Sequence, residues 1–239
     1  IHRSAKIEQI CTERIEKEFK EGKIVIVAGF QGIDQNGDIT TLGRGGSDTT
    51  AVALAAALNA DKCYIFSDVD GIYSADPNMI TIAKKLNEIS FVEMQEIADS
   101  GAKVLHNRCV QIGKRFDCNI IAKSTFIDSE GTKICKEIES TEVKSIVKNE
   151  KLIQINMSIP KQISKKVMLN MYQDLLENNI IVESFRKEGN SNIQFRANIA
   201  ELNKILELLE RKYQEFEVRQ NNIVKLSIVG YGITQDNTI

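Results

Sequence analysis

The sequence is poor in the features that mark metal centres, disulfide frameworks and membrane spans. Its two histidines, His2 and His106, have no metal-binding spacing, so we predict a structural role for His106 and no protein metal ligands. Its five cysteines include no C-x-x-C pair, which fits reduced, mostly buried thiols. The longest apolar run, residues 51–58, is too short to span a bilayer, and no signal peptide opens the chain. We therefore expect no membrane contact and a cytoplasmic location.

The charge balance argues against nucleic acid as a partner. The 239 residues carry 31 basic and 33 acidic side chains, and the net charge of -2 gives no reason to expect binding to nucleic acid. Two nucleotide-binding signatures are also missing. No Gly-Lys-Ser/Thr follows the glycines, as in a P-loop, and no G-x-G-x-x-G follows the first predicted strand. A hydrophobic content of 42% allows one large domain or two small ones.

The most informative stretch is residues 42–50, with the sequence LGRGGSDTT, which precedes an alanine-rich run over residues 51–59. Its glycines let the backbone pass close to a ligand, and the alanine-rich run predicts a helix that Ser47 or Asp48 can cap. Backbone amides and the positive end of the helix dipole favour a phosphate or carboxylate at this junction. Arg44 adds a cation suited to either anion. A tight turn with a good N-cap is the alternative that these residues leave open.

Helices and strands alternate in the prediction for the first part of the chain. The predicted elements are a helix within residues 1–22, a buried strand over 23–28, a turn at Asn36-Gly37, a strand over 62–66, helices over 89–100 and 102–114, and a strand over 118–122. A second polar loop, residues 67–77, suits a ribose, a base edge or a metal-bound phosphate, with a solvated turn as the alternative. Lys103, at the start of a predicted helix, is placed to meet a nucleotide phosphate.

The rest of the chain has a different pattern, and polar residues from 128 to 141 predict a boundary before it. The predicted elements are strands over 143–147 and 152–159, a helix from Ser164 to residue 179, strands over 180–186 and 193–197, a helix over 200–213, a short strand over 216–218 and a further strand over 223–230. Strand, helix, strand, strand, helix, strand is the order of a ferredoxin-like domain.

Five motifs, in order along the chain, resemble the C-terminal half of an aspartate kinase. They are Gly29-Phe30-Gln31-Gly32, residues 42–50, residues 67–77 with the sequence SDVDGIYSADP, residues 101–105 with GAKVL, and residues 123–126 with KSTF. The resemblance implies an α/β fold. Residues 1–138 would be the C-terminal, nucleotide-side half of an amino-acid-kinase αβα sandwich. Residues 139–239 would form a ferredoxin-like (ACT, βαββαβ) regulatory region, with a first unit and the start of a second.

The resemblance also implies an activity and a site. The activity is ATP-dependent phosphorylation of L-aspartate to 4-phospho-L-aspartate, the entry step to lysine, threonine and methionine synthesis, with Mg²⁺ as cofactor. Asp48 would organise the transfer rather than act as a strong base, because a carboxylate acceptor has no proton to remove. By motif position, the aspartate and phosphate-transfer region would be bounded by Arg44, Gly45, Gly46 and Ser47. The residues around ATP would be Ser67, Asp68, Tyr73, Ser74, Asp76, Pro77 and Lys103.

Two departures from the family pattern qualify this expectation. The Lys-Phe/Tyr-Gly-Gly motif of the family is absent, so we expect a fragment of a longer enzyme with little kinase activity by itself. Residues 159–164, with the sequence IPKQIS, stand where the family's effector loop has an Asp-x-Pro-Gly-like turn, which puts feedback by lysine or threonine through this unit in question. The resemblance implies a homo-oligomer joined through ACT units. The alternative function is a non-catalytic regulatory chain that associates with a separate catalytic chain.

Overall fold

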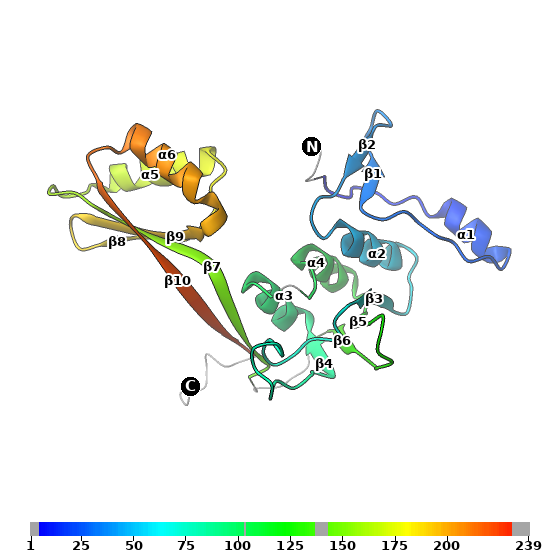
Figure 1. The fold of residues 1–239 in the computed structure, drawn as a ribbon. Helices are drawn as coiled ribbons and strands as arrows, with labels where there is room; N and C mark the ends of the chain where they lie inside the picture. Colours follow the sequence, from blue (N-terminus) through cyan, green and yellow to red (C-terminus); the bar gives the residue numbers. More distant parts are fainter. Residues whose placement is uncertain (1–4, 103, 137–142, 231–239) are drawn as a thin grey trace. The chain divides into compact units, whose positions relative to one another are not determined.

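The chain folds into two compact units (Figure 1). The computed structural model describes residues 5–102, 104–136 and 143–230. The first unit contains the chain up to Val147 together with the segment from Ser227 onward, and the second contains residues 148–226. The predicted boundary between residues 138 and 139 lies outside the described residues. No helix in the described part of the chain is long and apolar enough to cross a membrane.

The first described helix is shorter than predicted. Helix α1 spans Glu13–Lys20, and the chain closes it with Gly22 at φ +74°, where the amide of Lys23 donates to the carbonyl of Glu18 at 3.1 Å. This is a Schellman-type end, in which glycine adopts a left-handed conformation at no steric cost. The helix therefore ends at the glycine, as the sequence predicts.

The predicted buried strand over residues 23–28 is wrong. This segment has no regular secondary structure, and the side chains of Ile24 and Ile26 are each 94% exposed. A strand that is buried on both faces needs hydrogen-bonded neighbours and covering layers. Nothing in the described part of the chain pairs with this segment, so most of its apolar side chains are exposed and only Val25 is half-buried.

A short hairpin follows, and it confirms the predicted turn at Asn36-Gly37. Strands β1 (Gln31–Ile33) and β2 (Ile39–Thr41) pair in antiparallel register. The Asp34 carboxylate accepts hydrogen bonds from the amides of Asn36 and Asp38, at 2.9 and 3.0 Å. Gly37, at φ +87°, supplies the left-handed residue that such a turn requires.

The core of the first unit is a mixed sheet with three helices on one face (Figure 1). The strand order is β3-β5-β6-β4, in which β3 and β5 are parallel and β6 is antiparallel to β5. The strands are β3 (Cys63–Ser67), β4 (Glu88–Ser90), β5 (Ile120–Ser124) and β6 (Thr132–Cys135), and the helices are α2 (Gly46–Ala57), α3 (Phe91–Asp99) and α4 (Asn107–Phe116). Buried residues of all three helices, including Val52, Met94 and Cys109, pack with Ile120 of the sheet.

Several predicted boundaries in this unit need correction. Residues 132–135 form β6, although their polar surroundings favoured a domain boundary. Helix α3 begins only at Phe91, because Ser90 ends β4 and caps the helix through a capping box with Glu93. Helix α4 begins at Asn107, five residues later than predicted, and His106 is its N-cap. Its ring accepts a hydrogen bond from the amide of Arg108 at 3.3 Å, so the histidine has a structural role.

The second unit has the predicted ferredoxin-like order. Its elements are β7 (Ser145–Ser158), α5 (Lys165–Glu177), β8 (Val182–Glu188), β9 (Asn192–Asn198), a short 3-10 helix (Ile199–Glu201), α6 (Leu202–Lys212) and β10 (Glu217–Val229). The first residues of β7 and the last of β10 belong to the first unit. The strand order β10-β7-β9-β8 places the first and third strands at the centre, and both helices lie on one face of the sheet (Figure 1). The predicted α/β class and ferredoxin-like unit are confirmed.

Two pairs of predicted strands are each one continuous strand. Residues 148–151 and 219–222 are polar and suggested interruptions, but they lie within β7 and β10. Neither stretch contains glycine or proline, so the backbone continues while the charged side chains reach solvent. Beneath the helices the core contains Phe195, Met171 and Leu175, and Ser164 caps α5 as predicted.

Candidate functional site

Helix α2 begins at the glycine-rich loop, two or three residues earlier than a cap at Ser47 or Asp48 would place it. Its N-cap is Gly45, at φ +70°, and its first residue is Gly46. The predicted side-chain cap is therefore wrong, because both side chains already lie in the first turn. No side chain caps the first turn. The amide of Gly46 donates to the carbonyl of Gly43 at 3.0 Å, and the amides that follow it at the helix start are of the kind that can bind an anion.

The glycines are required because other elements approach the loop closely. A Cβ atom on Gly45 would lie 2.2 Å from the ring of His106, and one on Gly46 would lie 2.8 Å from the ring of Phe30. From the same side, the guanidinium of Arg108 donates to the carbonyl of Leu42 at 2.8 Å. The first turn of α4 thus supports the loop from behind. No sequence motif points to Arg108, because its role depends on a contact with a residue 66 positions away.

The predicted aspartate-side residues differ in exposure. Arg44 and Ser47 are exposed, whereas Asp48 is half-buried, and the Ser47 hydroxyl lies 3.5 Å from the Asp48 carboxylate. Burial, together with the negative charge of Asp48, raises the pKa of the Cys109 thiol to about 12. Cys109 is therefore a neutral thiol at pH 7. The groups available for chemistry here are the Arg44 cation, the Asp48 carboxylate and the amides of the helix start.

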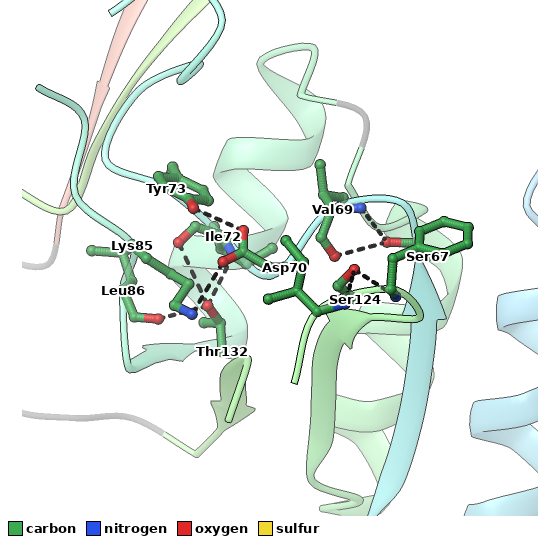
Figure 2. Close-up of polar contacts among 11 residues, drawn as sticks. Ser67, Val69, Asp70, Ile72, Tyr73, Lys85, Leu86, Ser124 and Thr132 are labelled. Atoms are coloured by element: carbon green, nitrogen blue, oxygen red, sulfur yellow. Dashed lines mark hydrogen bonds and ion pairs between the residues drawn. The ribbon is translucent and has the colours of Figure 1, made fainter. Parts of the chain in front are cut away.

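The second polar loop begins where two parallel strands end. Ser67 of β3 and Ser124 of β5 are register partners at the carboxyl ends of their strands, the edge at which open α/β sheets bind ligands. Both hydroxyls bond the local backbone (Figure 2). The Ser67 hydroxyl bonds the amide of Val69 at 3.2 Å, and the Ser124 hydroxyl accepts from the amide of Phe126 at 3.0 Å.

Farther along this loop, Tyr73 is turned toward an aspartate that the prediction did not include (Figure 2). Its hydroxyl donates to Asp70 at 2.7 Å, and the ammonium of Lys85 lies 3.2 Å from the other oxygen of the same carboxylate. The hydrogen bond from Tyr73 lowers the pKa of Asp70, and the same bond raises the pKa of Tyr73. Asp70 is ionised and Tyr73 neutral at pH 7.

The remaining predicted nucleotide residues lie mostly at the surface. Asp68, Asp76 and Pro77 are exposed, and the carboxylate of Asp76 accepts from the amide of Asn78 at 2.9 Å, which stabilises a turn. The Ser74 hydroxyl accepts from the amide of Lys84 at 3.0 Å. Lys103 lies outside the described residues.

The chain combines an α/β unit with a ferredoxin-like unit. The α/β unit has a glycine-rich helix start and a polar loop after a parallel strand, and these features together are typical of a kinase with a regulatory region. Residues 2–124 match the model of the amino acid kinase family, and the chain belongs to that family.

The similar proteins are aspartokinases. The aspartokinase of Bacillus sp. (strain MGA3) is 39% identical over 241 residues, which are 96% of this chain and 58% of that protein. The aspartokinase of Rickettsia felis is also 39% identical, over 98% of this chain and 60% of the relative. The chain thus spans about three-fifths of the length of these curated relatives.

Solved structures give the same result. The structure of E. coli aspartokinase III in complex with aspartate and ADP matches with a TM-score of 0.77 at 26% identity, over 95% of this chain and 53% of that one. A second structure of that enzyme, in complex with lysine and aspartate, matches with a TM-score of 0.74.

Proposed function

We propose that this chain is part of an aspartate kinase, which transfers the γ-phosphoryl group of ATP to the side-chain carboxylate of L-aspartate and forms 4-phospho-L-aspartate. The observation that carries the proposal is the start of α2, where a left-handed Gly45 leads into a first turn without a side-chain cap. Similarity to aspartokinases over 96% of the chain supports the choice of substrate. So does the presence of aspartate and ADP in the E. coli aspartokinase III structure.

At this helix start, phosphoryl transfer needs positioning and charge neutralisation more than covalent chemistry. Amides of the first turn and the guanidinium of Arg44 hold anionic oxygens, and Gly45 and Gly46 let those oxygens approach the backbone. Ser47 lies beside them. The carboxylate of Asp48 orients the groups around the transferred phosphate and removes no proton.

On the nucleotide side, the proposal assigns a group of residues in and near the second loop to ATP: Ser67, Asp68, Tyr73, Ser74, Asp76, Pro77 and Lys103. In the described residues no cluster of three or more His, Cys, Asp or Glu side chains is arranged to hold a metal. Mg²⁺ usually binds through substrate phosphates, waters and one or two carboxylates. Bound with ATP, Mg²⁺ neutralises charge on the phosphates.

The wider roles follow the same proposal. Residues 1–138 form the nucleotide-side part of the kinase domain, and residues 139–239 form the ACT region, with one unit and the start of a second. The enzyme catalyses the first step of lysine, threonine and methionine synthesis. It responds to lysine or threonine and assembles as a homo-oligomer through its ACT units.

The test is calorimetric titration of the protein with Mg-ATP, followed by an assay for aspartyl phosphate in the full-length protein. We expect Mg-ATP binding and phosphate transfer that depends on L-aspartate, with no transfer to L-glutamate as the control acceptor. A chain that does not bind Mg-ATP contradicts the proposal and favours the non-catalytic regulatory chain instead.

A further inference from the structure

A cluster of contacts holds the middle of the second loop against the rest of its unit. Of its members, Tyr73 is a predicted nucleotide residue, whereas Asp70 and Lys85 are not. Asp70 is at its centre, because its carboxylate receives the hydroxyl of Tyr73 on one oxygen and the ammonium of Lys85 on the other (Figure 2). The side chains of Asp70 and Lys85 are only 21% and 27% exposed. Such a shielded ion pair is weakened less by salt than a pair on the open surface.

The backbone beside Asp70 is fixed as well. Gly71 has φ +149°, and a Cβ atom there would lie 2.6 Å from the hydroxyl oxygen of Thr132. That hydroxyl, which is fully buried on β6, accepts from the amide of Ile72 at 2.8 Å and donates to the carbonyl of Leu86 at 2.6 Å (Figure 2). The amide of Leu86 in turn donates to the carbonyl of Ile72 at 2.8 Å. Residues 71 and 72 are therefore held on both sides.

Among the described residues, the carboxylates of Asp68 and Asp76 have no comparable attachment, since Asp76 accepts from the amide of Asn78 only two residues away. Asp68 precedes the cluster and Asp76 follows it, and both are exposed. Asp68 directly follows β3, whereas the position of Asp76 relative to β3 depends on how firmly the segment between them is held. Because Tyr73 also pairs with Lys85 through a backbone bridge, the lysine holds the loop through its side chain and its main chain.

We infer that Asp70 and Lys85 are positioning residues for the nucleotide, which set the place of Tyr73 and Asp76 without touching the nucleotide themselves. This inference rests on the proposed function of the loop. A loop that is ordered before binding loses less conformational freedom when the ligand binds, so affinity is higher than for a mobile loop. The hydroxyl of Tyr73 contributes by fixing Asp70, while its ring remains available to the ligand.

The experiment compares two charge-removing variants, Asp70→Asn and Lys85→Met, with the matched control Lys84→Met, which removes the exposed neighbouring ammonium. Two properties of the full-length protein are measured: the Kd of Mg-ADP by calorimetry, and hydrogen exchange of amides 68–80. We expect about ten-fold weaker binding in both variants, as for loss of a hydrogen bond to a charged group. We also expect faster exchange confined to this loop. The control stays within about two-fold of the parent protein, and Lys85→Arg restores binding.

The outcomes separate this inference from the proposed function. A parent protein that fails to bind Mg-ADP contradicts the proposed function. The inference that Asp70 and Lys85 position the nucleotide is then wrong as well. A parent protein that binds, with variants that bind equally well, overturns the inference alone. Faster exchange with unchanged affinity overturns it too, because the pair then stabilises the loop without positioning anything for the nucleotide. If Asp70→Asn does not fold, Tyr73→Phe removes only the hydroxyl and tests the same contact.

Discussion

Asp48 is the residue on which the proposed chemistry depends most. As a first-turn acid it interacts favourably with the dipole of α2, but its side chain makes no cap, so its contribution to folding is small. Removing its charge with Asp48→Asn should lower the rate of phosphoryl transfer in the full-length protein about 100-fold or more. The free energy of unfolding should change by no more than about 1 kcal/mol. Steady-state kinetics and urea unfolding measure the two quantities.

The matched control for this variant is Asp38→Asn, which changes an exposed acid in the hairpin turn. It should leave the rate of transfer near that of the parent protein. Loss of stability in proportion to loss of rate in Asp48→Asn would show that Asp48 serves the fold of the helix start rather than the reaction.

Asp174 makes the stability of the second unit depend on pH. Its carboxylate, on α5, pairs with the ammonium of Lys212 and accepts the hydroxyl of Tyr213 at 2.7 Å, and these bonds lower the pKa of Asp174. A group whose pKa is lower in the folded state contributes stability that is present above its unfolded pKa, about 3.9, and is lost as the pH falls through the folded value. The second unit should therefore lose stability as the pH falls below about 4.

Urea unfolding followed by circular dichroism between pH 2.5 and 7 measures this dependence. We expect Asp174→Asn to be less stable at pH 7 and to lose less stability than the parent protein on acidification. Curves of stability against pH that run parallel for the two proteins would contradict the role given to Asp174.

At the scale of residues, local chemistry could be predicted and long-range contacts could not. The need for glycine at positions 45 and 46 follows from the motif itself. The reasons, which are the ring of His106 and the ring of Phe30, come from segments that only the fold brings near. Asp70 belonged to the predicted polar loop, but its partner Lys85 lies 15 residues away and carries no motif of its own.

The capping box at the start of α3 is the element-scale contact with the clearest expected cost. Ser90 is buried, its hydroxyl accepts from the amide of Glu93, and the Glu93 carboxylate accepts from the amide and hydroxyl of Ser90. Ser90→Ala should lower the free energy of unfolding by about 1–2 kcal/mol, because the amide and the buried carboxylate of Glu93 each lose a partner. Thermal and urea unfolding measure the loss.

Ser164→Ala is the matched control, since Ser164 caps α5 at an exposed position through one bond of 3.3 Å. Its cost should be smaller, about 0.5–1 kcal/mol. An equal cost for the two variants would show that burial and the reciprocal bond from Glu93 add nothing at α3.

Elements with their own periodicity were predicted well, and elements that depend on neighbours were not. Helix α2 and strand β3 lie close to their predicted positions because their patterns are local. The strand predicted over residues 23–28 fails because an apolar run forms a strand only with a partner. Strand β6 was missed because it has only four residues and lies among polar residues. It forms because it pairs with β5, a contact that the local sequence does not reveal.

At the scale of the whole molecule, the ferredoxin-like unit was predictable from element order alone, since βαββαβ allows few strand arrangements. Which side chains of its closing strand face outward is known only from the fold. Strand β10 lies at the edge of the sheet, and the side chains of Val224, Leu226 and Ile228 are 56%, 67% and 46% exposed. Alternate positions along one strand face the same side, so the three form one apolar row.

A long edge strand with an exposed apolar row readily pairs with another chain unless something covers it. We expect a second copy of this protein to cover the row, which makes the protein a homodimer at least. The double variant Leu226→Lys and Ile228→Lys should give a folded monomer by light scattering and circular dichroism, because two buried cations would have to be desolvated in the dimer. Asn222→Lys adds a cation on the same face without removing an apolar side chain, and it should remain dimeric. A double variant that stays dimeric, or that unfolds, would exclude β10 as the dimer contact.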